Sequence, residues 1–244
     1  MRRLLRATAI GRMMRAAARS LAAVSVSADV AEVAEAVKPR LRGWLHAGMF
    51  PASIALGIVL VAIAGGREAR VACAIYAVTA VLLFGTSALY HRFTWSPRAN
   101  ALLRRLDHAN IFLIIAGTYT PTTYLLLDGA AERWLLSVVW VGALAGVAFR
   151  VIWVGAPRWL YTPIYVALGW AAVFFLPAFG RNGGAPVVVL IVVGGLLYTV
   201  AAVVYGLKRP NPSPRWFGFH EVFHALTIAA FLAHYIAVAL VATR

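Results

Sequence analysis

Seven apolar stretches constrain the fold of this chain more than any other feature of its sequence. They cover roughly residues 46–65, 71–91, 108–127, 134–154, 159–179, 186–206 and 219–242. Each is close to the ~20 residues that an α-helix needs to cross about 30 Å of hydrocarbon. Most of the polar links between them are too short to hold a domain. The sequence therefore predicts an all-α membrane protein, a seven-transmembrane helix bundle with hairpin connections.

The composition agrees with a membrane location and excludes several soluble classes. Apolar residues make up 62% of the chain, compared with about 45–50% in soluble domains. The single cysteine, Cys73, rules out an intrachain disulfide. The net charge of +15 would suggest nucleic-acid binding in a soluble protein, but the basic residues lie mainly between the apolar stretches. Basic loops of this kind contact anionic lipid and set topology, so we expect membrane lipids and no nucleic acid as partners.

The distribution of Lys and Arg predicts the orientation of the bundle. If the N-terminus is cytoplasmic, the inside regions hold 18 basic residues and the outside regions five. Positive residues are enriched in cytoplasmic loops. We therefore expect a multi-pass protein of the cell (inner) membrane, with its N-terminus cytoplasmic and its C-terminus outside.

The first 37 residues differ in character from the rest. Six arginines lie among Ala, Leu, Met and Ser up to Arg19, and three acidic residues follow. This pattern fits either a basic cytoplasmic tail that reinforces topology or a basic amphipathic helix on the inner leaflet. We divide the chain into this tail, residues 1–37, and a membrane domain, residues 38–244.

The predicted topology brings four ionisable residues to one depth of the membrane. His91 ends the second apolar stretch, Asp107 precedes the third, and His220 and His224 begin the seventh. All four positions fall on the cytoplasmic side of the predicted bundle. Ionisable groups inside a membrane are costly and mark functional sites.

Three imidazoles at one depth predict a zinc site with a fourth position left for water. His220 and His224 are four residues apart and share one helix face. Ser87 lies one turn before His91, where it can donate a hydrogen bond to a water or an oxyanion. Asp107 can accept a proton as general base or orient a ligand imidazole. Ser87 and Asp107 are therefore the candidate catalytic residues, and His91, His220 and His224 the candidate metal ligands.

Taken literally, the string from His220 to His224 is the H-E-x-x-H signature of zinc proteases, in which the glutamate is the base. The only later histidine, His234, lies about 15 Å further along the same helix and cannot share the metal. Glu221 is better placed to cap the first turn of its helix.

Other polar residues carry weaker expectations. His46 is expected at the headgroup boundary, His108 at the interface or bonded to a loop, and His234 on a carbonyl inside the bundle. The run from Thr118 to Pro121 predicts a helix kink whose freed carbonyl is satisfied by hydroxyls. A retinal-binding protein is excluded because Lys38 and Lys208, the only lysines, lie outside the apolar stretches. Haem is disfavoured because its two ligands must come from opposite faces of a ring.

Five motifs together resemble the hemolysin III family, the bacterial branch of the progestin and adipoQ receptor (PAQR) group, which is similar to alkaline ceramidases. The resemblance covers nearly all of residues 38–242. The motifs are Lys38 to His46, Ser87 to His91, Arg105 to Asn110, Ala116 to Pro121 and His220 to His224. The resemblance implies zinc bound by the histidine of S-x-x-x-H, here His91, and by both histidines of H-x-x-x-H, here His220 and His224. The family's serine and aspartate map onto Ser87 and Asp107.

These observations leave three hypotheses for function. The first is a zinc-dependent hydrolase of the ceramidase type, which cleaves an amide or ester bond of a lipid that enters from the inner leaflet. The second is a non-enzymatic regulator of membrane state with a structural zinc. The third, pore formation in target membranes, is suggested by the family name. Hydrolysis and regulation share the same metal site, so residue spacing does not separate them.

Overall fold

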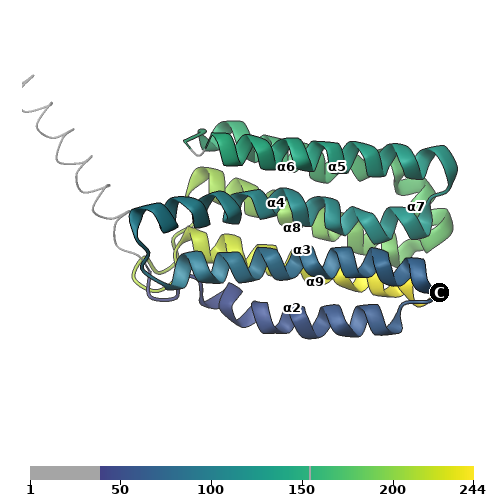
Figure 1. Ribbon diagram of the computed structural model, residues 1–244, viewed down its shortest axis with the longest axis horizontal. Helices are drawn as coiled ribbons and strands as arrows, with labels where there is room; N and C mark the ends of the chain where they lie inside the picture. The colour runs from purple at the N-terminus through teal and green to yellow at the C-terminus, as the bar shows by residue number, and fades with distance from the viewer. Residues whose placement is uncertain (1–38, 154) are drawn as a thin grey trace, which may run out of the picture. The chain divides into compact units, whose positions relative to one another are not determined.

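The computed structural model describes residues 39–153 and 155–244, and the remainder is drawn as a grey trace in Figure 1. The expected basic tail, residues 1–37, lies outside the described residues. Residues from Leu41 to Arg244 form one compact unit. All that follows concerns this unit.

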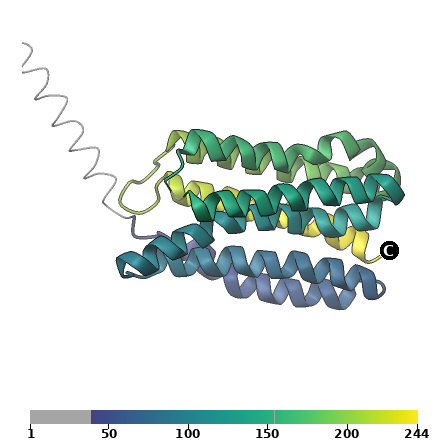
Figure 2. The same cartoon turned by 45° about the horizontal axis from the view of Figure 1, so that its top comes forward.

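Helices make up nearly the whole of this unit, and the described residues contain no β-strand. Figures 1 and 2 show the long helices running side by side along one direction. In chain order they are α2 (Trp44–Ile63), α3 (Arg67–Arg92), α4 (Pro97–Leu126), α5 (Gly129–Ile152), α6 (Arg158–Gly169), the 3-10 helix η1 (Trp170–Phe175), α7 (Leu176–Gly183), α8 (Ala185–Leu207) and α9 (Phe219–Ala242). Because α6, η1 and α7 are consecutive, they form one long segment.

Six segments within the described ranges are long and apolar enough to cross a membrane, namely α2, α3, α5, the segment from α6 to α7, α8 and α9. Large apolar side chains are exposed on their outer faces, including Ile58, Val141, Leu144 and Val200. Such exposure is costly in water and is expected in contact with lipid. The chain is therefore a multi-pass helical membrane protein, which confirms the predicted fold class at this level.

The helix α4 differs from its expected bounds. The sequence predicted a link from Arg92 to Asp107, but α4 begins at Pro97 and continues through Asp107. Ser96 supplies the N-cap, and its Oγ accepts a hydrogen bond from the Ala99 amide at 3.4 Å. Pro97 suits the first helical position because it has no amide hydrogen to satisfy there. Hydropathy missed this extension because basic and polar residues interrupt its apolar ones.

The fifth apolar stretch is broken, where one continuous helix was expected. The α-helix ends at Gly169 and a 3-10 helix takes its place before α7. Tyr119 of α4 satisfies the break, because its hydroxyl donates to the Gly169 carbonyl and accepts from the Ala172 amide, both at 2.7 Å. A 3-10 stretch inside a helix often lies at a functional position, and Gly169 indeed lines the main cavity.

The run from Thr118 to Pro121 is helical, and α4 continues through it. The hydroxyl of Thr118 donates to the Ile114 carbonyl, that of Thr120 to Ala116, and that of Thr122 to Thr118. Proline at position 121 frees the carbonyl four residues earlier, which belongs to Gly117. The hydroxyls therefore serve neighbouring carbonyls, and the expectation that they satisfy the freed one was wrong.

The last helix, α9, packs against four others, α2, α3, α4 and α8. A buried aromatic cluster that includes Tyr76, Phe84 and Phe231 joins α3 to α9. Helices α3 and α4 approach closely at Gly117, where an added Cβ would lie 2.0 Å from Oγ1 of Thr79. This packing fixes the end of α3 beside the start of α9, at the end of the bundle opposite the C-terminus in Figure 1.

Candidate metal centre

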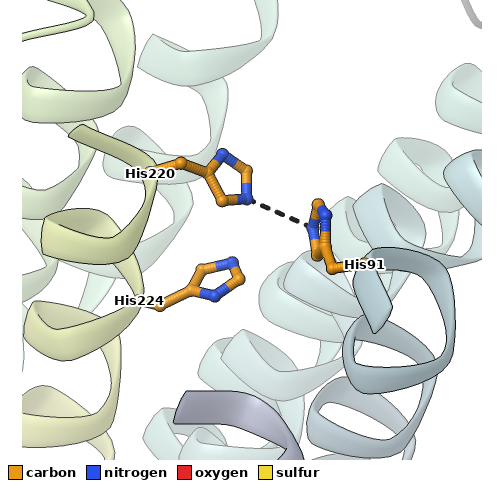
Figure 3. Close-up of side chains that lie close together, drawn as sticks. All are labelled: His91, His220 and His224. Atoms are coloured by element: carbon orange, nitrogen blue, oxygen red, sulfur yellow. Dashed lines mark hydrogen bonds between the residues drawn. The ribbon is translucent and has the colours of Figure 1, made fainter. Parts of the chain in front are cut away.

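Three histidines from two helices meet at this end of the bundle. His220 and His224 project from α9 toward His91 at the end of α3 (Figure 3). One nitrogen from each ring lies within 4.8 Å of the others. The Nε2 atoms of His220 and His91 are 3.1 Å apart. His91 and His224 are buried and His220 is half-buried.

This arrangement fits a small metal ion. Tetrahedral zinc with Zn–N bonds of about 2.0–2.1 Å requires donor nitrogens about 3.3 Å apart, close to the separation of the His91 and His220 Nε2 atoms. A nitrogen of His224 lies within 4.8 Å of a nitrogen of each of the other two rings. Neutral imidazole is a preferred zinc donor, and three of them leave a fourth position open.

Asp107 lies beside the same histidines. Its Oδ2 is 3.7 Å from Nε2 of His91, the nitrogen that also faces His220. The carboxylate therefore lies on the metal-facing side of His91 and not behind it. One turn further along α4, the Asn110 amide donates to the Leu82 carbonyl and to the Thr86 hydroxyl. These bonds anchor α4 on α3 and hold Asp107 at this depth.

Ser87 shares the wall of a large cavity with Asp107, His220 and His224. It lies one turn before His91 on α3, and its side chain is buried. The cavity encloses about 1130 Å³ of space between the side chains, part of it open to the outside. Beyond the polar end, its walls are mainly apolar and aromatic, and they include Ile111, Tyr165, Trp170, Tyr198 and Phe223.

Glu221, the base in the protease interpretation, is fully engaged elsewhere. Its Oε1 accepts from Nε of Arg42 at 2.5 Å, and its Oε2 accepts from the Gly218 amide at 2.8 Å. The second bond closes the first turn of α9, which confirms the expected capping role. With both oxygens bonded and the side chain buried, Glu221 is not available as a base.

His46 was expected at the headgroup boundary, and this expectation was wrong. Its side chain is 2% exposed, and its ring stacks on that of His224 with centroids 3.7 Å apart and an angle of 8°. Hydropathy placed His46 near a helix end but could not show which way that end faces. The sequence signal that could have indicated a role for His46 was its place at the end of the motif from Lys38 to His46.

The two remaining histidines lie outside the three-histidine cluster. His108 contacts Arg150 of α5, with 2.5 Å between Nδ1 and Nη2, so its side chain is bonded to a helix and not to a loop. His234 contacts the Ile191 carbonyl through Nε2 at 3.2 Å, as expected for a histidine inside the bundle. Both line the cavity.

The fold and the site define a class: a multi-pass helical membrane protein with a buried histidine cluster that opens on an apolar cavity. The sequence model of the family described as Haemolysin-III related matches residues 34–235. The chain belongs to this family.

Individual relatives agree with the assignment. Hemolysin-3 of Bacillus cereus is 33% identical over 141 residues, which are 58% of this chain and 64% of the relative. The Hemolysin-3 homolog of Bacillus subtilis is 32% identical over 66% of this chain and 76% of the relative. The adiponectin receptor protein of Drosophila melanogaster is 27% identical over 65% of this chain and 39% of the relative. The last similarity links the chain to the PAQR group.

Proposed function

We propose that this protein is a zinc-dependent hydrolase that cleaves an amide or ester bond of a membrane lipid. The observation that carries the proposal is the position of the three-histidine cluster: two of its members, His220 and His224, line a mainly apolar cavity together with Asp107 and Ser87. A polar reactive end and an apolar body match the two parts of a lipid. The metal would be held by His91, His220 and His224.

Zinc, when bound, supplies a Lewis acid that polarises a carbonyl and lowers the pKa of water toward about 7. Asp107 faces the cluster and can take the proton of the attacking water, because its carboxylate lies on the same side as Nε2 of His91. The Ser87 hydroxyl can donate to the oxygen on which negative charge develops. The aromatic walls hold the acyl part and exclude water from it.

The placement of this site in the membrane is part of the proposal. We infer that the N-terminus is cytoplasmic, that α4 crosses the membrane with the six more apolar segments, and that the C-terminus is outside. The excess of Lys and Arg on the inferred inner side supports this orientation. The histidine cluster then lies in the inner leaflet of the cell membrane, within reach of lipid substrates.

Zinc content is the first test. Purified wild-type protein should hold about one zinc ion per chain, as three histidine ligands imply. His224→Ala should lose it, while His234→Ala, which removes a half-buried histidine far from the cluster, should keep it. Full zinc retention in His224→Ala would remove this ligand set.

Lipid turnover is the second test. Mass spectrometry of lipid extracts should show a lipid consumed and its acid product formed with wild type and not with Asp107→Asn. This variant keeps the shape of the side chain and removes its basicity. Equal lipid profiles with intact zinc content in both proteins would favour a non-enzymatic regulator of membrane state, and leakage of target vesicles would favour pore formation.

A further inference from the structure

The segment from Arg42 to His46 contacts two histidines of the cluster and the residue beside the third, although the proposed chemistry uses none of its residues. Arg42 pairs with Glu221, the residue after His220. Gly43 lies against His91, and an added Cβ there would be 2.7 Å from the His91 Cβ. Gly43 also has a φ of +79°, which favours glycine. His46 stacks on His224. One short segment therefore lies against both helices that carry the histidines.

His46 makes its contact through the face of its ring. Both ring nitrogens are buried and have no hydrogen-bond partner among the described residues. A buried polar atom without a partner is destabilising, so this position needs a physical explanation. The Phe84 and His46 rings meet edge to face, with centroids 5.1 Å apart and an angle of 85°. His46 is thus held on one side by Phe84 of α3 and presents its flat face to His224.

The contact replaces a support that His224 lacks. Histidines that bind metals usually donate their second nitrogen to a carboxylate or carbonyl, which fixes the orientation of the ring. Within the described part of the chain, the recorded contacts of His224 are ring contacts and include no hydrogen bond. A parallel ring 3.7 Å away limits rotation of His224 in the same way that such a bond would.

We propose that His46 is a positioning residue of the metal centre: its ring face holds the His224 imidazole in the orientation that meets His91 and His220. The segment from Arg42 to Gly43 fixes His46 at the start of α2. This inference rests on the proposed metal site and gives a role to a motif that the hydrolysis mechanism leaves unused.

Zinc affinity of variants at His46 tests this role, because it is measured without any assay of activity. His46→Phe keeps a flat ring, His46→Leu fills a similar volume without one, and His46→Ala removes the contact. Loss of a residue that supports a metal ligand typically weakens affinity by about 10–100-fold. We expect His46→Phe to bind zinc within about threefold of wild type, and His46→Leu and His46→Ala at least about tenfold more weakly.

Controls separate this effect from misfolding and from failure of the metal site itself. His234→Ala should keep wild-type zinc affinity, and thermal unfolding of each metal-free variant shows whether it is folded. If His46→Ala does not fold, the zinc affinities of His46→Leu and His46→Phe still show whether the ring contact is needed. The visible spectrum of bound Co²⁺ should change with Leu and stay close to wild type with Phe.

The remaining outcomes overturn the inference in distinguishable ways. Wild-type affinity in His46→Leu or, when folded, in His46→Ala would show that the ring contact does not position His224. An equal loss in His46→Phe and His46→Leu would show that the ring nitrogens matter and not the ring face. Absence of zinc from the wild-type protein would remove the proposed metal site, and this inference with it.

Discussion

At the scale of single residues, Glu221 shows that one sequence motif can have different roles in different structures. In a soluble protease the glutamate of H-E-x-x-H acts as a base. Here its two oxygens are bonded to Arg42 and to the Gly218 amide, and its side chain is 1% exposed. The ion pair joins residues 179 positions apart, so it ties the segment before α2 to the start of α9.

Removal of Arg42 should be strongly destabilising. Arg42→Ala leaves the buried Glu221 carboxylate without its counter-ion, and breaking a buried pair from one side costs about 3–5 kcal/mol. Thermal unfolding in detergent should show a clear fall in midpoint. Adding Glu221→Gln to Arg42→Ala removes the unpaired charge and should recover a large part of the loss. If the double variant is as unstable as Arg42→Ala, the pair is not the cause.

Zinc bound by His91, His220 and His224 should stabilise the folded protein. A ligand that binds only the native state adds about 2.7 kcal/mol at one hundred times its Kd. Stripping the metal with a chelator should therefore lower the unfolding midpoint of the wild-type protein, and added Zn²⁺ should restore it. The midpoint of His224→Ala should not respond to either treatment. A response equal to that of wild type would point to zinc bound elsewhere.

At the scale of helices, hydropathy predicted the apolar lengths well and the ends less well. The last stretch, residues 219–242, matches α9 at both ends, because Gly218 and a short polar link bound it. The start of α4 was missed because it depends on the cap at Ser96 and not on apolar content. The break after Gly169 was missed because it depends on Tyr119, a residue of another helix.

Tyr119→Phe should destabilise the bundle at this break. The substitution removes one hydroxyl and leaves the Ala172 amide and the Gly169 carbonyl without that partner. Unsatisfied buried groups cost about 1–3 kcal/mol each, so the unfolding midpoint should fall. Tyr124→Phe is the matched control, because the Tyr124 hydroxyl bonds to Glu68 at the exposed surface and its loss should change stability by less than about 0.5 kcal/mol. Equal effects of the two variants would contradict this role of Tyr119.

At the scale of the whole molecule, the sequence was sufficient to place His91, Asp107, His220 and His224 at one end of the bundle. Alternating the direction of successive helices gives their depth without any tertiary information. Rotation of each helix about its own axis requires side-chain packing, and this decides which polar residues face inward. For that reason His46 was expected at the headgroup boundary, whereas its buried ring lies against His224.

The inferred topology can be tested with single cysteines in a Cys73→Ala background. Thr94 lies between α3 and α4, and Asp128 lies between α4 and α5; both are exposed. On intact cells, a membrane-impermeant maleimide should label Asp128→Cys and leave Thr94→Cys unlabelled until the cells are opened. The reverse pattern would invert the topology. Identical labelling of both positions would show that α4 does not cross.

The contacts of α9 with four earlier helices have a consequence for how the protein is made. His91 is separated from His220 by 129 residues, and the two meet only when the last helix packs between α2, α3, α4 and α8. The ribosome must therefore translate the chain as far as α9, and the earlier segments must enter the bilayer, before the histidine cluster exists. Metal loading would then be a late step in biogenesis, and a chain that stalls before α9 would carry no competent site.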